Sequence, residues 1–401
     1  MAELPRVVMV GPMGPHDRMP TAGGTYVHAV RQALSEYADV TALAPDDPVN
    51  RRALSADGLP TAFLLVGRGD RRLVARAARF VAQHVFAALH RFDVAVPHLS
   101  YAVSLVLDPR ARRTLRDADV VDLQFSEYIR LVPLLRLLAP RARLVGTFHD
   151  VLSQRYRRYV AAREPSAPLR TWRTSAWLAR RSEQAALRRL DVAATLNDKD
   201  AALLGGRTVV LDPPLWNGSD AVRARAGHPV VLFVGALDRE DNQDAVAYLL
   251  DEVWPAVLAH RPEARLRIVG AGAGSGLADV LGSAPGVEAP GFVDDLPGEY
   301  AAAWCVVVPL RLGAGVKFKT IEALVAGVPT VTTTIGAEGI PAARRLEVVT
   351  DDPAVFAAAV RRVLDDPAAA DARAETVRSW ACERYSAVRF RERVGSVYGL
   401  R

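Results

Sequence analysis

The stretch CVVVPLRLGAGVKFKTIEALVAGVPTVTT, residues 305–333, decides the fold because it holds a strand, a turn and a helix in direct succession. The apolar run 305–310 predicts a buried strand, and the turn after it contains Gly313 and Gly315. A helix is predicted from about 316 to 326, and a glycine and a proline follow it in the order that ends helices. A strand that leads through glycines into a helix is typical of parallel α/β sheets.

The same alternation of short β-branched runs and longer helical patterns extends over the whole chain of 401 residues, which favours two domains. The predicted strands are RVVMVG, DVTAL, ADVVDLQ, ARLVGTFH and DVAATLN in the first half, and PVVLFVG, RLRIVG, CVVVPL and VPTVTTT in the second. One buried helix face is predicted from Val246, Leu249, Leu250, Val253, Trp254, Val257 and Leu258. We therefore expect two doubly wound, Rossmann-like domains facing each other across a cleft.

The boundary between the two domains is predicted at a stretch rich in Pro, Gly and polar residues. The first domain is expected over 1–212, a linker over 213–228 and the second domain over 229–379. A final helix over 380–401 is expected to pack back on the first domain.

Composition narrows the class of protein. The chain is 50% hydrophobic and 24% charged, as soluble globular proteins are, and its two cysteines exclude a disulfide framework. No apolar run reaches the roughly 20 residues of a spanning helix, and the N-terminus does not have the pattern of a signal peptide. A cytoplasmic protein is expected, and the second option is a peripheral location at the inner face of the membrane.

Positive charge is concentrated in the first half, where residues 1–212 hold 31 Lys or Arg against 21 Asp or Glu. This excess is either a solvated set of Arg-rich helix faces or a surface for anionic lipid or a phosphorylated acceptor. Nucleic acid is not expected as a partner, since no binding motif accompanies the charge.

Two of the only three lysines in the chain, Lys317 and Lys319, lie in the turn and helix of the opening stretch. Glycines let the backbone approach a ligand, and the amides at a helix start favour an anion. Glu322, one turn further along, can accept hydrogen bonds from paired ribose hydroxyls. A turn of this kind is common in α/β folds, but lysines, helix start and carboxylate together favour a nucleotide diphosphate.

The segment 309–340 resembles the donor-binding signature of retaining glycosyltransferases of family 4, which have the GT-B fold. VVLFVGALDREDNQ, from residue 230, is similar to the start of that family's second domain, and VEAPGFVDDLPGEYAAA, 287–303, to its segment near the nucleobase. In the first half the resemblance thins to TAGGTYVHAV, DLQFSEY, GTFHD and TLNDKD.

The resemblance implies roles for particular residues. The second domain would bind a nucleotide-sugar donor and the first an acceptor of unknown identity. Catalytic roles would fall to His149 on the cleft wall, Lys319 at the diphosphate and Glu322 at the ribose. The residues implied in donor binding are Gly23 and Gly24 in a first-domain loop, Gly235, Arg239, Val293, Gly313, Ala314, Gly315, Val316 and Lys317. From the residues alone, a histidine at a strand end can equally be structural, and Asp150 and Asn197 can simply cap helices.

Two positions depart from the family's pattern. The family often has two glutamates with seven residues between them, and the position of the first, counted back from Glu322, is Ala314. The donor sugar must therefore be contacted by other groups. The arginine that often follows the glycine of the first strand is Ala236, and Arg239 is a possible substitute.

The predicted function is transfer of a sugar from a nucleotide-diphosphate sugar to a hydroxyl of a glycolipid, polysaccharide or secondary metabolite, which is hexosyltransferase chemistry. No cofactor and no metal ion are expected, because lysines and helix dipole already offset the diphosphate charge. The alternatives are a nucleotide-sugar epimerase of the same fold and an inactive nucleotide-sugar-binding partner protein. An NAD dehydrogenase comes last, for want of a G-x-G-x-x-G fingerprint.

Overall fold

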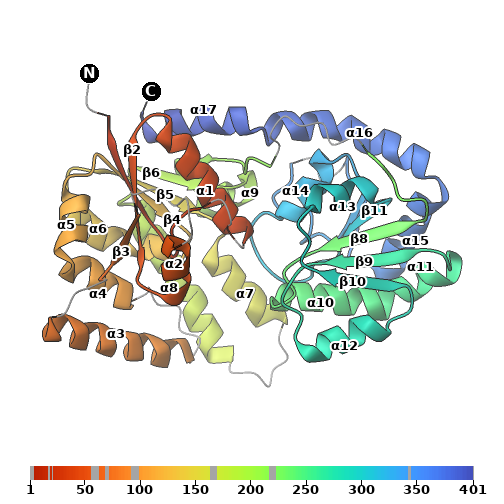
Figure 1. Cartoon of the computed structure of the whole chain (residues 1–401), viewed down its shortest axis with the longest axis horizontal. Helices are drawn as coiled ribbons and strands as arrows, with labels where there is room; N and C mark the ends of the chain where they lie inside the picture. The colour runs from red at the N-terminus through yellow and green to blue at the C-terminus, as the bar shows by residue number, and fades with distance from the viewer. Residues whose placement is uncertain are drawn as a thin grey trace. The chain divides into compact units, whose positions relative to one another are not determined.

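The computed structural model describes residues 4–16, 19, 21–55, 63–67, 72–91, 99–162, 169–215, 223–341 and 345–400. The chain divides into two compact units (Figure 1). Unit 1 comprises Met1–Pro213 and Phe390–Arg401, and unit 2 comprises Pro214–Arg389. The predicted linker, 213–228, starts at this boundary, although its residues 216–222 lie outside the described part of the chain.

The described residues of unit 1 form a parallel sheet in the order β3-β2-β1-β4-β5-β6-β7. Its strands are β1 (Arg6–Val10), β2 (Asp39–Pro45), β3 (Phe63–Val66), β4 (Val120–Gln124), β5 (Arg143–Phe148), β6 (Val192–Thr195) and β7 (Thr208–Val210). Its helices are α1 (Ala22–Ser35), α2 (Pro48–Ser55), α3 (Leu73–Arg91), α4 (Leu99–Leu107), α5 (Pro109–Arg116), the 3₁₀ turn η1 (Tyr128–Leu131), α6 (Val132–Leu138), α7 (Leu152–Ala162), α8 (Leu169–Leu187) and α9 (Asp198–Leu204).

Unit 2 has a second parallel sheet, in the order β10-β9-β8-β11-β12-β13. Its strands are β8 (Val230–Val234), β9 (Arg265–Val269), β10 (Val287–Gly291), β11 (Cys305–Val308), β12 (Thr330–Thr332) and β13 (Val348–Val349). Its helices are α10 (Glu240–Tyr248), the π-helical turn η2 (Leu249–Val253), α11 (Trp254–His260), α12 (Ser275–Ser283), α13 (Leu296–Ala302), α14 (Phe318–Val325), α15 (Pro353–Asp365) and α16 (Pro367–Arg384). Helix α17 (Ala387–Tyr398) follows, and from Phe390 on it belongs to unit 1.

Both sheets are doubly wound, as the strand alternation predicted. In each, a central pair of neighbouring strands, β1–β4 and β8–β11, marks the point where the strand order reverses. Ligands of open α/β sheets bind outside the carboxyl ends of strands at such points. The loops that follow these four strands are therefore the places to examine for a site.

Three helices differ from their predicted form. The helix face predicted over 246–258 is α10, η2 and α11 in succession, and a π-turn precedes Pro255. The helix after Gly315 begins at Phe318 instead of residue 316, because Lys317 is its extended N-cap. The single helix predicted to the C-terminus is two helices: Ser386 Oγ accepts from the backbone N–H of Val388 at 3.2 Å and so starts α17 anew.

Candidate functional site

The loop between β11 and α14 has a backbone that only glycine adopts readily. Gly313 has φ of 105° and Gly315 has φ of 75°, both in the left-handed region. A Cβ atom on Gly313 would lie 3.5 Å from Asp241 Oδ2 and from Lys317 Nζ. The loop after β11 and the start of α10 after β8 therefore meet, as expected for adjacent strands at the switch point.

Lys317 stabilises this loop from within. Its side chain is only 8% exposed, and its ammonium donates to the carbonyl oxygens of Ala314 at 3.0 Å and Gly315 at 2.9 Å. Val316, between Gly315 and Lys317, is half-buried against the apolar cluster beneath α14. Lys317 thus combines a positive charge at the helix start with a structural function that the sequence did not indicate.

Lys319 lies in the first turn of α14, and its side chain contacts α10 and β8. Its Nζ donates to Asn242 Oδ1 at 2.7 Å and lies 4.5 Å from the centroid of the Phe233 ring. Burial lowers the pKa of Lys319 from its usual 10.5 to about 7. A Cβ atom on Gly235 would come within 2.8 Å of this Nζ, so glycine is required where β8 ends.

Glu322 lies one turn along α14, as predicted, but it is not simply a solvent-facing carboxylate. The hydroxyl of buried Tyr300 donates to Glu322 Oε2 at 2.8 Å. Burial raises the pKa of Glu322, against the effect of that hydrogen bond and of Lys319. The hydrogen bond orients the carboxylate and leaves Oε1 as a second acceptor for a ligand.

Two further predicted donor-binding residues follow β8 and β10, strands that are separated in the sheet by β9. Arg239 is the N-cap residue of α10, and its guanidinium forms a two-pronged ion pair with Asp241 at 3.0 Å for each hydrogen bond. It is 65% exposed, so a ligand can compete for it. Val293 follows β10 and is half-buried against the core of unit 2.

In unit 1, Gly23 and Gly24 lie in the first turn of α1, and the expectation that they form a loop is wrong. Thr21 Oγ1 accepts from the Gly24 N–H at 3.1 Å and caps this helix. A Cβ atom on Gly23 would lie 2.9 Å from the Phe125 ring and 3.3 Å from His149 Nδ1. A residue without a side chain is therefore favoured at position 23, because Phe125 and His149, which follow β4 and β5, pack against this turn.

His149 follows β5 and lies between two aromatic rings. The Phe125 ring stacks on it with centroids 4.2 Å apart, and Tyr26 meets it edge-on at 5.3 Å. Phe125 has φ of 74°, a conformation that is uncommon for any residue with a side chain. Burial lowers the pKa of His149 to about 4, so the ring is neutral near pH 7.

A buried chain of hydrogen bonds fixes the tautomer of that neutral ring. Asp122 accepts from Gln124 Nε2 at 2.9 Å and from the Tyr398 hydroxyl at 2.7 Å. Because an ionised carboxylate only accepts, the Gln124 amide turns its oxygen to His149 Nε2, 3.0 Å away. His149 therefore carries its proton on Nε2, and Nδ1 is the acceptor that faces the start of α1.

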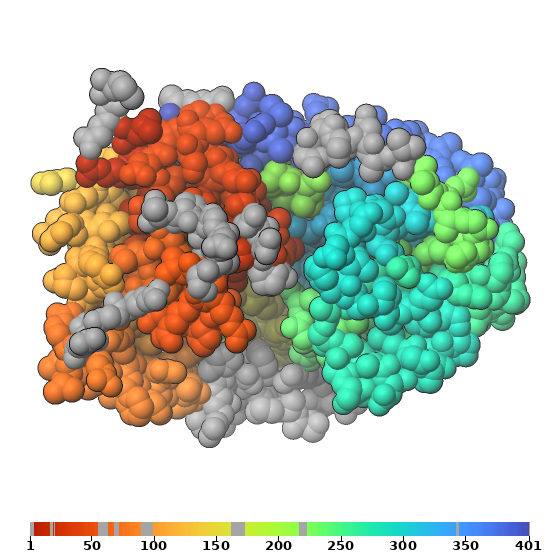
Figure 2. Space-filling view, viewed as in Figure 1, coloured from red at the N-terminus to blue at the C-terminus, as the bar shows by residue number. Residues whose placement is uncertain are grey.

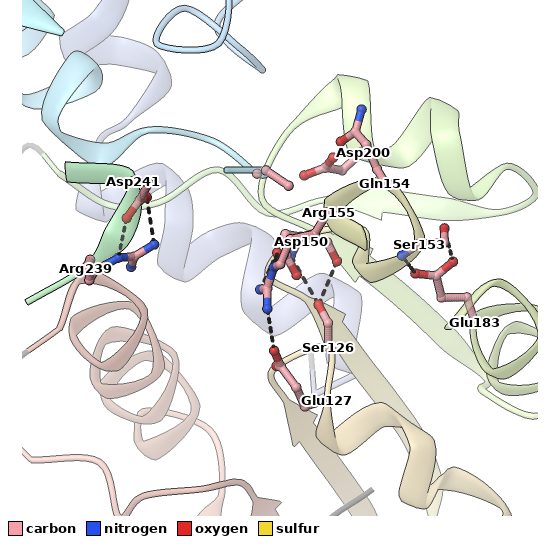
Figure 3. Close-up of polar contacts among 12 residues, drawn as sticks. Ser126, Glu127, Asp150, Ser153, Gln154, Arg155, Glu183, Asp200, Arg239 and Asp241 are labelled. Atoms are coloured by element: carbon pink, nitrogen blue, oxygen red, sulfur yellow. Dashed lines mark hydrogen bonds and ion pairs between the residues drawn. The ribbon is translucent and has the colours of Figure 1, made fainter. Parts of the chain in front are cut away.

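Figure 3 shows how the loops after β4 and β5 are joined. Arg155 Nε donates to Asp150 Oδ2 at 2.7 Å, and its Nη1 donates to Glu127 Oε1 at 2.9 Å. Ser126 Oγ donates to the Asp150 carbonyl at 2.7 Å, and Glu183 Oε2 accepts from the Ser153 hydroxyl at 2.7 Å. Asp150 is thus an ion-pair partner of Arg155, whereas Asn197 does cap α9, through the N–H of Asp200.

Sequence reasoning missed the residues that orient the predicted ones: Asn242, Tyr300, Phe125, Tyr26, Gln124, Asp122 and Tyr398. Asp122 offered the one usable signal, an acidic residue in an otherwise apolar central strand. The others are ordinary in local sequence and acquire their function only by contact.

Two kinds of feature are absent from the described residues. No three His, Cys, Asp or Glu side chains among them converge as a metal site would require. No helix among them is long and apolar enough to cross a membrane.

Part of the second unit is similar in sequence to known proteins. Residues 228–366 match the family model described as glycosyl transferases group 1. An uncharacterised 44.6 kDa protein from the cps region of Klebsiella pneumoniae is 31% identical over 117 residues, covering 27% of this chain and 30% of that protein. Glycogen synthase of Mycobacterium tuberculosis is 29% identical over 252 residues, covering 59% of this chain and 58% of that protein. The matches thus span between about a third and three fifths of these relatives.

Solved structures extend the likeness over the whole chain. Sucrose-phosphate synthase from Thermosynechococcus elongatus has a TM-score of 0.67 at 17% identity, covering 98% of both chains. Anabaena Alr3699/HepE, solved in complex with UDP and glucose, has a TM-score of 0.66 at 15% identity, covering 98% of this chain and 99% of that one. The chain therefore has the GT-B fold of glycosyltransferases, and residues 228–366 of its second unit match a domain of glycosyl transferases group 1.

Proposed function

We propose that this chain is a retaining glycosyltransferase that moves a sugar from a nucleotide-diphosphate sugar to an acceptor hydroxyl. The observation that carries the proposal is the convergence, at the β8–β11 switch point, of a glycine loop, the start of α14, two lysines and a tyrosine-oriented glutamate. The group 1 glycosyltransferase domain that covers this region supports it.

In this proposal unit 2 binds the donor. The diphosphate lies at the start of α14, where the amides of the first turn and the two ammonium groups offset its charge. Glu322 accepts from the ribose hydroxyls through Oε1, since Oε2 already accepts from Tyr300. With Ala314 in place of a carboxylate, backbone N–H groups of the 313–316 loop contact the donor sugar.

The chemical step follows from this placement. The bond between the anomeric carbon and the diphosphate oxygen breaks, the acceptor oxygen bonds to the same face of that carbon, and the acceptor proton passes to a diphosphate oxygen. Lys319 and the helix start stabilise the charge that develops on the departing diphosphate. No metal ion is required in this scheme, so a chelator should leave turnover intact.

Unit 1 is proposed to bind the acceptor, with His149 contributing a neutral ring whose Nδ1 accepts a hydrogen bond from a sugar hydroxyl. A neutral histidine serves this purpose better than a cation, because the anomeric carbon becomes positive as the bond breaks. The buried Asp122–Gln124 pair maintains the required tautomer.

The test begins with donor binding. UDP-glucose is the first candidate because Anabaena Alr3699/HepE was also solved in complex with UDP-glucose. A donor at 100 times its dissociation constant should stabilise the fold by about 2.7 kcal/mol in a thermal-shift assay. Turnover with a panel of hydroxyl acceptors then gives a product whose anomeric proton, read by NMR, should show the donor's configuration.

Each alternative has its own outcome. Free sugar released without any acceptor would favour the epimerase, and donor binding without turnover would favour an inactive partner protein. An inverted product would contradict the retaining mechanism alone. No stabilisation by any nucleotide sugar would contradict the donor site itself.

A further inference from the structure

Helix α3 (Leu73–Arg91) is unusual in unit 1 because most of its length is exposed. Among its described side chains, Ala75 and Ala82 are the buried ones. Those small residues face the rest of unit 1, where α3 runs beside α4 along its margin (Figure 1). Because α3 packs on unit 1 through alanines on one side, its other sides are exposed and can contact a partner.

The available side is apolar. Leu73 is 78% exposed, Val74 79%, Phe80 62%, Val81 59% and Val85 44%. At about 100° per residue these five fall on one arc of roughly 140°, and the same arc contains the exposed Ala77, His84 and Ala88. We call these eight residues the α3 stripe; the atoms of α3 appear in orange at the surface in Figure 2.

No other described helix or strand has such a stripe. Each of the others carries at most one large apolar side chain exposed to this degree, for example Leu137 on α6 and Val355 on α15. Single exposed apolar residues are normal, whereas a contiguous row of them marks an interaction surface.

Charge identifies the kind of partner. Arg72, Arg76 and Arg79 lie on the flank of the helix between its buried side and the α3 stripe, and residues 71–92 contain no Asp or Glu. Arg76 is exposed beside the stripe, whereas Arg79 is half-buried and Arg72 also donates to the Leu107 carbonyl. A second copy of the chain would place arginine against arginine at this helix. A surface with an apolar interior and a negatively charged exterior can contact both the apolar side chains of the stripe and the arginines beside it.

We propose that α3 docks on the surface of an anionic lipid bilayer. The apolar side chains of the stripe enter the boundary between headgroups and acyl chains, and the arginines contact lipid phosphates, as interfacial amphipathic helices do. This inference is independent of the proposed glycosyl transfer, since it concerns a surface remote in sequence from the donor loops. It also gives a function to part of the arginine excess in the first half of the sequence.

The experiment is co-sedimentation of the full chain with vesicles. Vesicles of phosphatidylcholine and phosphatidylglycerol should bind it at low salt, and vesicles of phosphatidylcholine alone should bind at least tenfold less. The double variant Leu73→Ser/Phe80→Ser should weaken binding at least tenfold, because two apolar side chains leave the interface. Arg76→Gln should weaken it about fivefold and reduce its dependence on salt.

Matched controls separate the stripe from general exposure. Leu137→Ser replaces an equally exposed leucine on α6, and Arg391→Gln an exposed arginine on α17; both should bind vesicles like the wild type. The folding of every variant is checked by its thermal midpoint. The proposal fails if the double variant binds as tightly as the wild type, or if the wild type does not bind anionic vesicles. It also fails if sedimentation shows a dimer that the double variant abolishes.

Discussion

The donor-side loops of unit 2 and the His149 region of unit 1 are built in opposite ways. In unit 2 the residues proposed to bind the donor are close in sequence, from Gly313 to Glu322, and the proposal assigns most of the binding to backbone and charge. In unit 1 a single ring is oriented by residues as distant as Asp122 and Tyr398, through hydrogen bonds buried in the sheet. The comparison teaches that a site made by local backbone geometry can be predicted from a motif, whereas one made by long-range side-chain contacts cannot.

The largest effect is expected at Glu322. Glu322→Ala should weaken donor binding by about 1–3 kcal/mol, because charge-assisted hydrogen bonds to the ribose are lost. It should also lower the thermal midpoint slightly, since the Tyr300 hydroxyl loses its short hydrogen bond to Glu322 and keeps only the Lys319 carbonyl, 3.4 Å away, as an acceptor. Titration calorimetry measures the affinity, with Glu375→Ala on exposed α16 as control. Unchanged affinity would remove the ribose role and blur the contrast between the two units.

Lys319→Arg keeps the charge but should lower turnover at least tenfold, about 1.4 kcal/mol of barrier. A guanidinium is wider than the ammonium that fits between Asn242, the Phe233 ring and the Gly235 backbone. Steady-state kinetics on Lys199→Arg, the remaining lysine, supplies the control. Wild-type turnover in Lys319→Arg would mean that the lysine is incidental.

The lowered pKa of Lys319 predicts a pH dependence of donor binding. A diphosphate favours the protonated amine, so binding takes up a proton wherever the free amine is neutral, which is above about pH 7. Donor affinity should therefore fall about fivefold between pH 7 and 8. Calorimetry in buffers of different ionisation enthalpy measures the proton uptake directly. Lys319→Arg should abolish it, and uptake that persists in that variant would point to another group.

The smallest effect concerns the buried chain of hydrogen bonds that orients His149 in unit 1. Tyr398→Phe removes one of the donors to Asp122 and should lower stability by about 0.5–1.5 kcal/mol. Burial raises the pKa of Asp122 from 3.8 to about 6, while the hydroxyl of Tyr398 favours its charged form. The native state therefore loses stability as pH rises through this window, and the loss extends to higher pH without the hydroxyl.

Thermal midpoints measured at pH 5 and pH 8 test the predicted direction of this pH dependence of stability. The difference between Tyr398→Phe and the wild type should be larger at pH 8, where Asp122 is ionised. A difference that is the same at both values would mean that Asp122 stays protonated and does not orient Gln124.

The sequence by itself determined the doubly wound class, the core strands and the glycine loop between β11 and α14. The nine predicted strands correspond to β1, β2, β4, β5, β6, β8, β9, β11 and β12, whereas the strands it missed, β3, β7, β10 and β13, are the edges of the two sheets. A central parallel strand is buried on both faces and is therefore mostly apolar, which makes its sequence distinctive even where a polar residue such as Asp122 interrupts it. An edge strand such as β7 is only half-buried and has no such requirement.

Only the tertiary structure decided how the site residues are held. Glycines with positive φ and lysines beside them can be read locally, since the backbone imposes the residue type. The partners of His149, the acceptor of Lys319 and the tyrosine on Glu322 come from other strands and helices, where glutamine, asparagine and tyrosine are unremarkable until folding buries them together. A buried polar group must find a hydrogen-bond partner, and which partner it finds depends on the packing and not on the sequence around it.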